Sequence, residues 1–202
     1  MKFHKIRKSS LALTTLALTS LAVANSIPEA KAVSLGDQFS LSPFWDWQTI
    51  ETERFRITFP KELTAQAQKV AQYYEEAHTV LSPKIYWAPD HKVQVLVTDQ
   101  ADSANGLASP VSRFGMLLYL TPPETWFSTT YYEDWLKLLV FHEYTHYLIM
   151  DTTRGVYSGL RYLFGDVILP NSLWPTWMLE GYAVYMETKY TRAGREIGRA
   201  HI

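Results

Sequence analysis

The chain of 202 residues contains no cysteine. A protein without disulfides depends on its hydrophobic core, and a lipid-modified cysteine after the N-terminal apolar segment is excluded. Internal repeats and low-complexity tracts are absent as well. The most apolar segment, residues 11–24, is shorter than the about 20 residues that a membrane-spanning helix needs. The sequence therefore predicts one domain with its own core and no transmembrane helix in the mature chain.

Basic residues are scarce outside the N-terminus. The whole chain carries 19 lysines and arginines against 20 aspartates and glutamates. Residues 1–24 hold four of the basic residues and no acidic one, so the remainder has 15 basic and 20 acidic residues and a net charge of −5. A mildly acidic domain without a basic cluster is a poor candidate for nucleic-acid binding. No nucleic-acid partner is therefore expected.

Residues 1–24 have the pattern of a signal peptide, with a basic stretch followed by an apolar one. Small-residue cleavage patterns end at Ala24 and at Ala32. The first suits the length of the apolar stretch better, so we predict cleavage after Ala24, with Ala32 as the later option. An uncleaved signal anchor is the alternative interpretation. The pattern predicts an exported protein that acts in the periplasm, in the extracellular space or at the cell surface.

The remaining chain mixes strand and helix patterns, which predicts an α+β fold. Residues 25–46 are expected to be a flexible lead-in, and residues 47–202 a single domain. Alternating apolar and polar residues predict strands at 55–59, 92–97 and 113–120. Helical spacing and composition predict helices at 63–81, 134–150 and 175–190, with a short one around 159–164. Residues 99–109 are expected to form a loop around the turn signal Asn105-Gly106.

The predicted helix at 134–150 carries the string H-E-x-x-H at His142 to His146. In a helix these two imidazoles lie on one face, about 6 Å apart along the axis, so both can bind one tetrahedral zinc ion. Glu143 lies beside the first ligand and can act as general base on a metal-activated water. Polar side chains within an apolar helix need partners, which a metal supplies. Two core histidines hydrogen-bonded within the protein are the alternative.

A second string, residues 177–187, supplies a third candidate ligand, Glu180. Three protein ligands leave one coordination position open, as in catalytic rather than structural zinc sites. Glu187 lies on the same helix face as Glu180 and is the candidate carboxylate for orienting a ligand histidine. A solvated surface charge is the alternative for Glu187. Gly181, which is costly within a helix, and the small Ala183 indicate a close approach to another helix.

H-E-x-x-H at 142–146 and W-x-x-E-G-x-A-x-Y-x-E at 177–187 together resemble the gluzincin zinc metallopeptidases, most closely their aminopeptidase-type branch. The layout from residue 47 onward is similar to exported bacterial proteins that carry a peptidase-like domain ahead of a β-propeller. The resemblance implies a zincin-like fold, in which a small mixed sheet packs on the H-E-x-x-H helix and the following Glu-bearing helix. It also implies one Zn²⁺ per chain on His142, His146 and Glu180, with Glu143 as general base.

The sequence departs from the family in several places. The substrate-anchoring string Gly-x-Met-Glu-Asn is missing, because residues 113–117 read R-F-G-M-L without the glutamate, so recognition of a free N-terminal amine is not expected. Residues 151–175 are longer than the same connection in compact members, which predicts an insertion that shapes or covers the cleft. Members also use a downstream tyrosine or histidine to stabilise the oxyanion. The candidates for this role are Tyr182, Tyr185, Tyr190 and His201.

The predicted function is zinc-dependent hydrolysis of peptide bonds in a peptide or protein substrate. The strand at 113–120, if it borders the cleft, would bind the substrate backbone as an added strand. The alternative is an exported zinc-binding, peptidase-like module that acts in binding or assembly without proteolysis. A purely structural zinc site would need a fourth protein ligand, and the sequence suggests none. Because the family continues well past Tyr190, the C-terminal lobe is expected to be incomplete here, with a β-propeller domain following.

Overall fold

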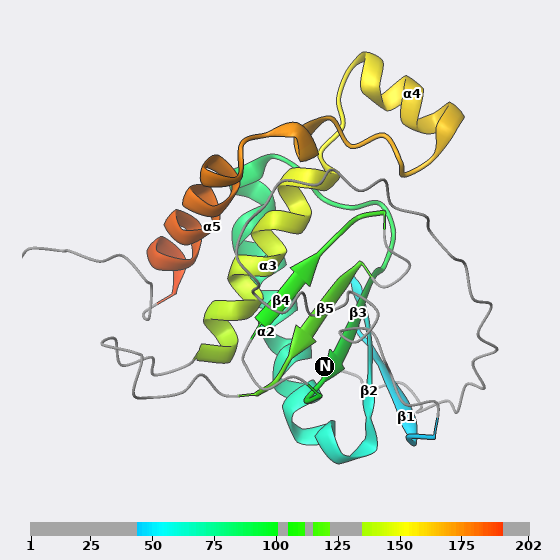
Figure 1. Ribbon diagram of the computed structural model, residues 1–202, viewed down its shortest axis with the longest axis vertical. Coiled ribbons are helices and arrows are strands. Elements are labelled where there is room, and N and C mark those ends of the chain that lie inside the picture. Colours follow the sequence, from blue (N-terminus) through cyan, green and yellow to red (C-terminus); the bar gives the residue numbers. More distant parts are fainter. Residues whose placement is uncertain (1–43, 101–104, 112–114, 122–134, 192–202) are drawn as a thin grey trace, which may run out of the picture.

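The computed structural model in Figure 1 describes residues 44–100, 105–111, 115–121 and 135–191. Its fold is α+β, as the sequence predicts, with one five-stranded mixed sheet and four α-helices among the described residues. The predicted signal peptide, most of the expected lead-in and the oxyanion candidate His201 lie outside these ranges. None of the helices in the described ranges has the length and apolarity to span a membrane.

The sheet has the strand order β1-β2-β3-β5-β4. Strands β2, β3 and β5 pair in parallel, whereas β1 and β4 pair antiparallel at the two edges. Their bounds are β1 Trp47–Glu51, β2 Phe55–Pro60, β3 Val93–Thr98, β4 Asn105–Ala108 and β5 Met116–Tyr119. The predicted strands at 55–59 and 92–97 are confirmed, and the third is confirmed from residue 116 onward.

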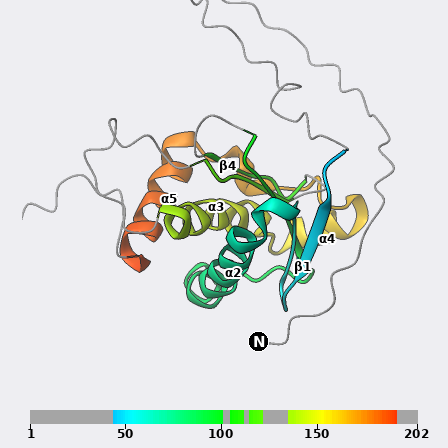
Figure 2. The same cartoon turned by 90° about the horizontal axis from the view of Figure 1, so that it is seen from below.

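Helices α2 (Thr64–Ile85) and α3 (Trp135–Asp151) cover one face of the sheet, and α5 (Thr176–Tyr190) packs on α3 (Figures 1 and 2). The main core lies between the sheet and these helices, where alternate strand residues such as Phe55 and Ile57 are fully buried. A short 3₁₀ turn, η1 (Lys61–Leu63), leads from β2 into α2. The helix that bears the two histidines therefore lies in the middle of the fold, between the sheet, α2 and α5.

Two local expectations were wrong. Helix α2 continues through Pro83 to Ile85 instead of ending at residue 81, before Pro83. Near a helix end the missing N–H of proline removes only one backbone bond, and the helix ends where Tyr86 turns left-handed with φ of 56°. Residues 105–108 form the edge strand β4 rather than loop. The side chain of Asn105 accepts a hydrogen bond from the backbone N–H of Gly106 at 2.8 Å, a turn-like feature that the short strand accommodates.

The connection between α3 and α5 contains α4 (Val156–Phe164) and a 3₁₀ turn, η2 (Pro170–Leu173). It is tied to the end of α3 by Asp151, which is 1% exposed. The Asp151 carboxylate accepts hydrogen bonds from the Trp87 indole at 2.7 Å and from the Arg161 guanidinium at 2.6 Å. Because a buried carboxylate needs such partners, this clamp fixes the base of α4. The rest of α4 projects from the body of the fold (Figure 1).

Candidate metal centre

Helix α3 is buried along nearly its whole length, including its polar residues. His142 is 6% exposed, Glu143 6% and His146 9%. Fourteen of its residues are buried in all, as expected for a helix with so apolar a sequence. Burying two histidines and a glutamate is costly unless each finds a partner, so their contacts decide what this helix can do.

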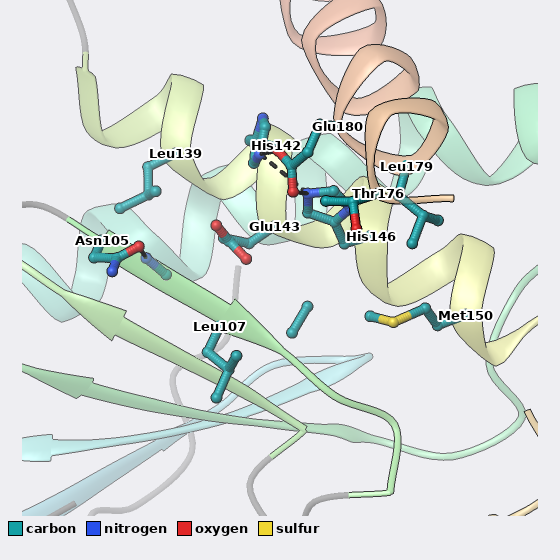
Figure 3. A pocket seen from close by; sticks show the side chains of 12 residues that line it. Asn105, Leu107, Leu139, His142, Glu143, His146, Met150, Thr176, Leu179 and Glu180 are labelled. Atoms are coloured by element: carbon teal, nitrogen blue, oxygen red, sulfur yellow. Dashed lines mark hydrogen bonds and ion pairs between the residues drawn. The ribbon is translucent and has the colours of Figure 1, made fainter. Parts of the chain in front are cut away.

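The two histidines meet Glu180 of α5 at one end of a cleft (Figure 3). Their Nε2 atoms are 3.1 Å apart. The Glu180 carboxylate places Oε2 3.3 Å from Nε2 of His142 and Oε1 3.4 Å from Nε2 of His146. One ligand atom from each of the three side chains lies within 4.8 Å of the others. The described residues thus contain a candidate metal-binding triad, formed by the residues that the sequence singled out.

Glu187 lies about two turns after Glu180 on α5 and contacts His142 on the side of the ring away from the triad. Its Oε2 is 2.9 Å from Nδ1 of His142, and its side chain is fully buried, so the alternative of a solvated surface charge is excluded. A carboxylate can only accept, so Nδ1 carries the proton and Nε2 presents its lone pair towards Glu180. Glu187 therefore holds His142 in the tautomer and orientation that a metal ligand requires.

The surroundings of His146 favour its neutral form. Burial lowers the pKa of this imidazole, and the neighbouring His142 lowers it further. A neutral imidazole offers a lone pair, whereas an imidazolium offers none, so a depressed pKa keeps His146 available to a metal at neutral pH.

The chemistry of this donor set fits a metal cation. Two imidazole nitrogens and a carboxylate converge on one point, and no lysine or arginine is among the described residues that line the cleft. Lone pairs and a negative charge held this close repel one another unless a shared proton or a metal cation lies among them. Two nitrogen ligands and one oxygen ligand, with solvent access through the cleft, are the ligand types of catalytic rather than structural transition-metal sites.

The cleft beside the triad has a volume of about 400 Å³. It lies between β4, α3 and the start of α5, and Glu143 extends into it between the triad and β4 (Figure 3). Apart from Glu143 and the triad its lining is mainly apolar, with contributions from Leu107, Ala108, Leu139, Met150 and Leu179. No described residue of the connection 151–175 lines it, so the expected role of that segment in shaping or covering the cleft finds no support.

Several lining residues were not anticipated from the sequence. Leu139 lies three residues before His142 on α3, and Met150 lies four residues after His146. That spacing alone could have placed them on the same helix face as the histidines. Leu107 and Ala108 could not be found in this way, because β4 was expected to be loop. Helical periodicity was thus enough to identify the lining residues of α3, whereas an edge strand of four residues shows no pattern from which its lining residues could be identified.

The interpretation of Gly181 was wrong. A Cβ placed on this residue meets nothing within 4 Å, so Gly181 makes no close helix approach. The approach is made by Ala183, which is completely buried where α5 packs on α3. Glycine at position 181 therefore leaves room for an alanine side chain, which makes it a useful control site.

None of the three tyrosine candidates for oxyanion stabilisation lines the cleft among the described residues. Tyr182 faces a separate cavity together with Trp174 and Lys84. Tyr185 is half exposed and accepts a hydrogen bond from Lys189 at 2.6 Å, while Tyr190 packs at the edge of the core. The oxyanion role of these residues stays a prediction, as does that of His201, which is not described.

Neither a protein-family model, nor a curated protein, nor a solved structure matches this chain. The geometry and chemistry of the residues in the cleft are therefore the basis on which a function can be proposed.

Replacing Glu187 with glutamine should weaken metal binding about 10–100-fold, the usual effect of losing a carboxylate behind a ligand histidine. The amide can offer its NH₂ to Nδ1 of His142 and so drive the proton to Nε2, where it blocks coordination. Competition titration against a chromogenic chelator measures the change. Glu76→Gln, an exposed carboxylate on α2 that pairs with Lys137, is the control. Equal affinities for the two variants would show that Glu187 does not orient the ligand.

Proposed function

We propose that this protein is a zinc-dependent hydrolase of peptide bonds. One observation carries the proposal: Glu143, buried on α3, extends into a cleft beside a triad of two histidines and a glutamate. A triad with an open side, next to a carboxylate that is not part of it, is the arrangement of a hydrolytic metal site. The resemblance of residues 142–146 and 177–187 to gluzincin peptidases supports the same reaction.

His142, His146 and Glu180 would hold the ion, and Glu187 would keep His142 in place. Bound there, zinc supplies Lewis acidity, which makes water acidic enough to attack near neutral pH and polarises a carbonyl group. Nitrogen and carboxylate ligands in this number suit zinc, and thiolates are absent from the chain. The signal-peptide pattern at residues 1–24 supports an activity outside the cytoplasm.

Glu143 has the role of general base and then of general acid. Its carboxylate takes a proton from the attacking water, whose oxygen forms a bond to the carbonyl carbon of the scissile peptide. The same carboxyl group then gives this proton to the leaving nitrogen as the C–N bond breaks. The products are a new carboxyl group and a new amine, which become a carboxylate and an ammonium group when the second proton of the water passes from one to the other. Glu143 returns to its starting state.

The edge strand β4 is the best candidate to bind the substrate backbone. The strand expected for this role, β5, is paired on both sides by β3 and β4 and has no free edge. Strand β4 has no second partner among the described strands, and its residues Asn105 to Ala108 line the cleft. An extended peptide can add to such an edge through backbone hydrogen bonds, with Glu143 and the triad beside it.

A binding or assembly module without proteolysis is the second candidate function. It is favoured by the described lining of the cleft, which includes no tyrosine and no histidine beyond the triad that could stabilise an oxyanion. Such a module would bind zinc and an extended chain at β4 and leave the chain intact.

A peptide-library digest at neutral pH separates the two functions. The full chain is incubated with the library as isolated, after treatment with a metal chelator, and after zinc is restored. The hydrolase should cleave in the first and third samples and be inactive in the second. Stoichiometric zinc binding without cleavage of any peptide would reject the hydrolase in favour of the module, and cleavage that survives the chelator would reject a metal-dependent mechanism.

A further inference from the structure

Gly106 of β4 lies directly against the side chain of Glu143. A Cβ placed on Gly106 would be 2.3 Å from Cγ of Glu143, 2.4 Å from Cδ and 2.6 Å from Oε1. Contacts this short are far inside van der Waals distance, so no side chain fits at position 106 while Glu143 keeps its place. The cleft that holds the carboxylate therefore exists because residue 106 has no side chain.

The backbone gives no other reason for a glycine at this position. The described glycines with positive φ are Gly115, Gly155 and Gly165, and Gly106 is not among them. Within a strand, glycine is unfavourable unless another group approaches its backbone closely. At Gly106 that group is the side chain of Glu143.

The neighbouring positions follow the same logic. Gly106 and Ala108 alternate with the more exposed Asn105 and Leu107, so they share the face of β4 that is turned towards α3. On the adjacent strand β5, the core carries the large side chains of Met116 and Leu118. The sheet thus changes from large to small side chains where it passes beneath Glu143, and Gly106 is the smallest.

We propose that Gly106 is a positioning residue for Glu143. Its missing side chain sets where the carboxylate stands relative to the triad and to a peptide bound on β4. A methyl group at position 106 must either rotate Glu143 about χ1, because Cγ is the nearest of the three atoms it strikes, or push β4 away from α3. Either change alters the distance between the general base and the scissile bond. The catalytic consequence rests on the proposed function, whereas the packing relation does not.

The catalytic test is Gly106→Ala, compared with Gly181→Ala and Gly159→Ala, whose added Cβ atoms meet nothing within 4 Å. Because a misplacement of about 1 Å in a catalytic group can cost about 10²-fold in rate, kcat should fall about 10²-fold in Gly106→Ala. KM and the zinc stoichiometry should stay near those of the parent, and both control variants should keep the parent's kcat. An unchanged kcat in Gly106→Ala, or a loss confined to KM, would overturn the proposal.

A second test needs neither zinc nor activity. Glu143→Ala removes all three atoms that the new methyl group would strike. In urea unfolding of the metal-free protein, Gly106→Ala should lower the midpoint when Glu143 is present. In the Glu143→Ala background it should leave the midpoint unchanged or raise it, because alanine restricts the unfolded chain more than glycine does. Equal shifts in the two backgrounds would show that Gly106 does not act through Glu143. If the peptide digest finds no hydrolysis, the proposed function fails, and this cycle still decides whether the two residues are coupled.

Discussion

Replacing Glu143 with glutamine is expected to abolish peptide hydrolysis while one zinc ion stays bound. Glutamine has nearly the same shape as glutamate, so the packing against Gly106 is kept. Its amide cannot take a proton from the attacking water, and losing a general base usually costs at least about 10²–10⁴-fold in rate. Glu143 does not belong to the triad, so the replacement removes no candidate ligand. The measurements are kcat/KM on a peptide found in the digest and the metal content of the variant.

Glu62→Gln is the matched control for this experiment. Glu62 is exposed in the 3₁₀ turn η1, on the side of the fold where β2 leads into α2. This variant should keep both the activity and the zinc content of the parent. A Glu143→Gln protein that cleaves peptides as fast as the parent would show that another group is the base, and a variant that loses its zinc would show that Glu143 is itself a ligand.

Replacing Glu180 with alanine is expected to remove both the metal and the activity. Glu180 is the only member of the triad that comes from α5, and without it two imidazoles of α3 remain. A two-ligand site holds a divalent ion weakly, so the loss of zinc affinity should exceed the about 10–100-fold loss expected for Glu187. Alanine suits a helix, and the Glu180 side chain is 54% exposed, so the fold should tolerate the change.

Chelator competition on Glu180→Ala, Glu187→Gln and Glu62→Ala tests this order directly. The loss of affinity should be largest for Glu180, intermediate for Glu187 and absent for Glu62. Far-UV circular dichroism of the metal-free proteins should be the same for all three. If Glu180→Ala bound zinc as tightly as the parent, the ion would be held elsewhere, and the triad would have to be abandoned as the metal centre.

The sequence predicted most of what lies on the helices. The spacing of His142 and His146 places them on one helical face whatever surrounds them, and the apolar sequence between residues 135 and 150 could only be satisfied in a core. Glu180 and Glu187 could likewise be placed on one face of α5. Their meeting with the histidines depends on how α5 packs on α3, and the short string 177–187 was the sequence signal for that contact.

The opposite wall of the cleft was not predictable in this way. Strand β4 has four residues, too few for alternation to stand out, and Asn105-Gly106 is more typical of a turn. The need for glycine at position 106 can be recognised only when the position of Glu143 is known, because the contact joins two residues that are far apart in the chain. Gly181 shows the converse, because a glycine in a helical pattern was assigned a packing role that belongs to Ala183.

The edge of β4 also bears on solubility. A strand edge that can receive an extended peptide can equally receive the same strand from a second molecule, which is how native proteins begin to aggregate. Here the edge is only four residues long, begins with Asn105, and is followed closely by Pro110, which has no N–H to extend the pairing. These limits allow a short extended segment to pair with β4 and disfavour continuous edge-to-edge pairing between copies of the protein.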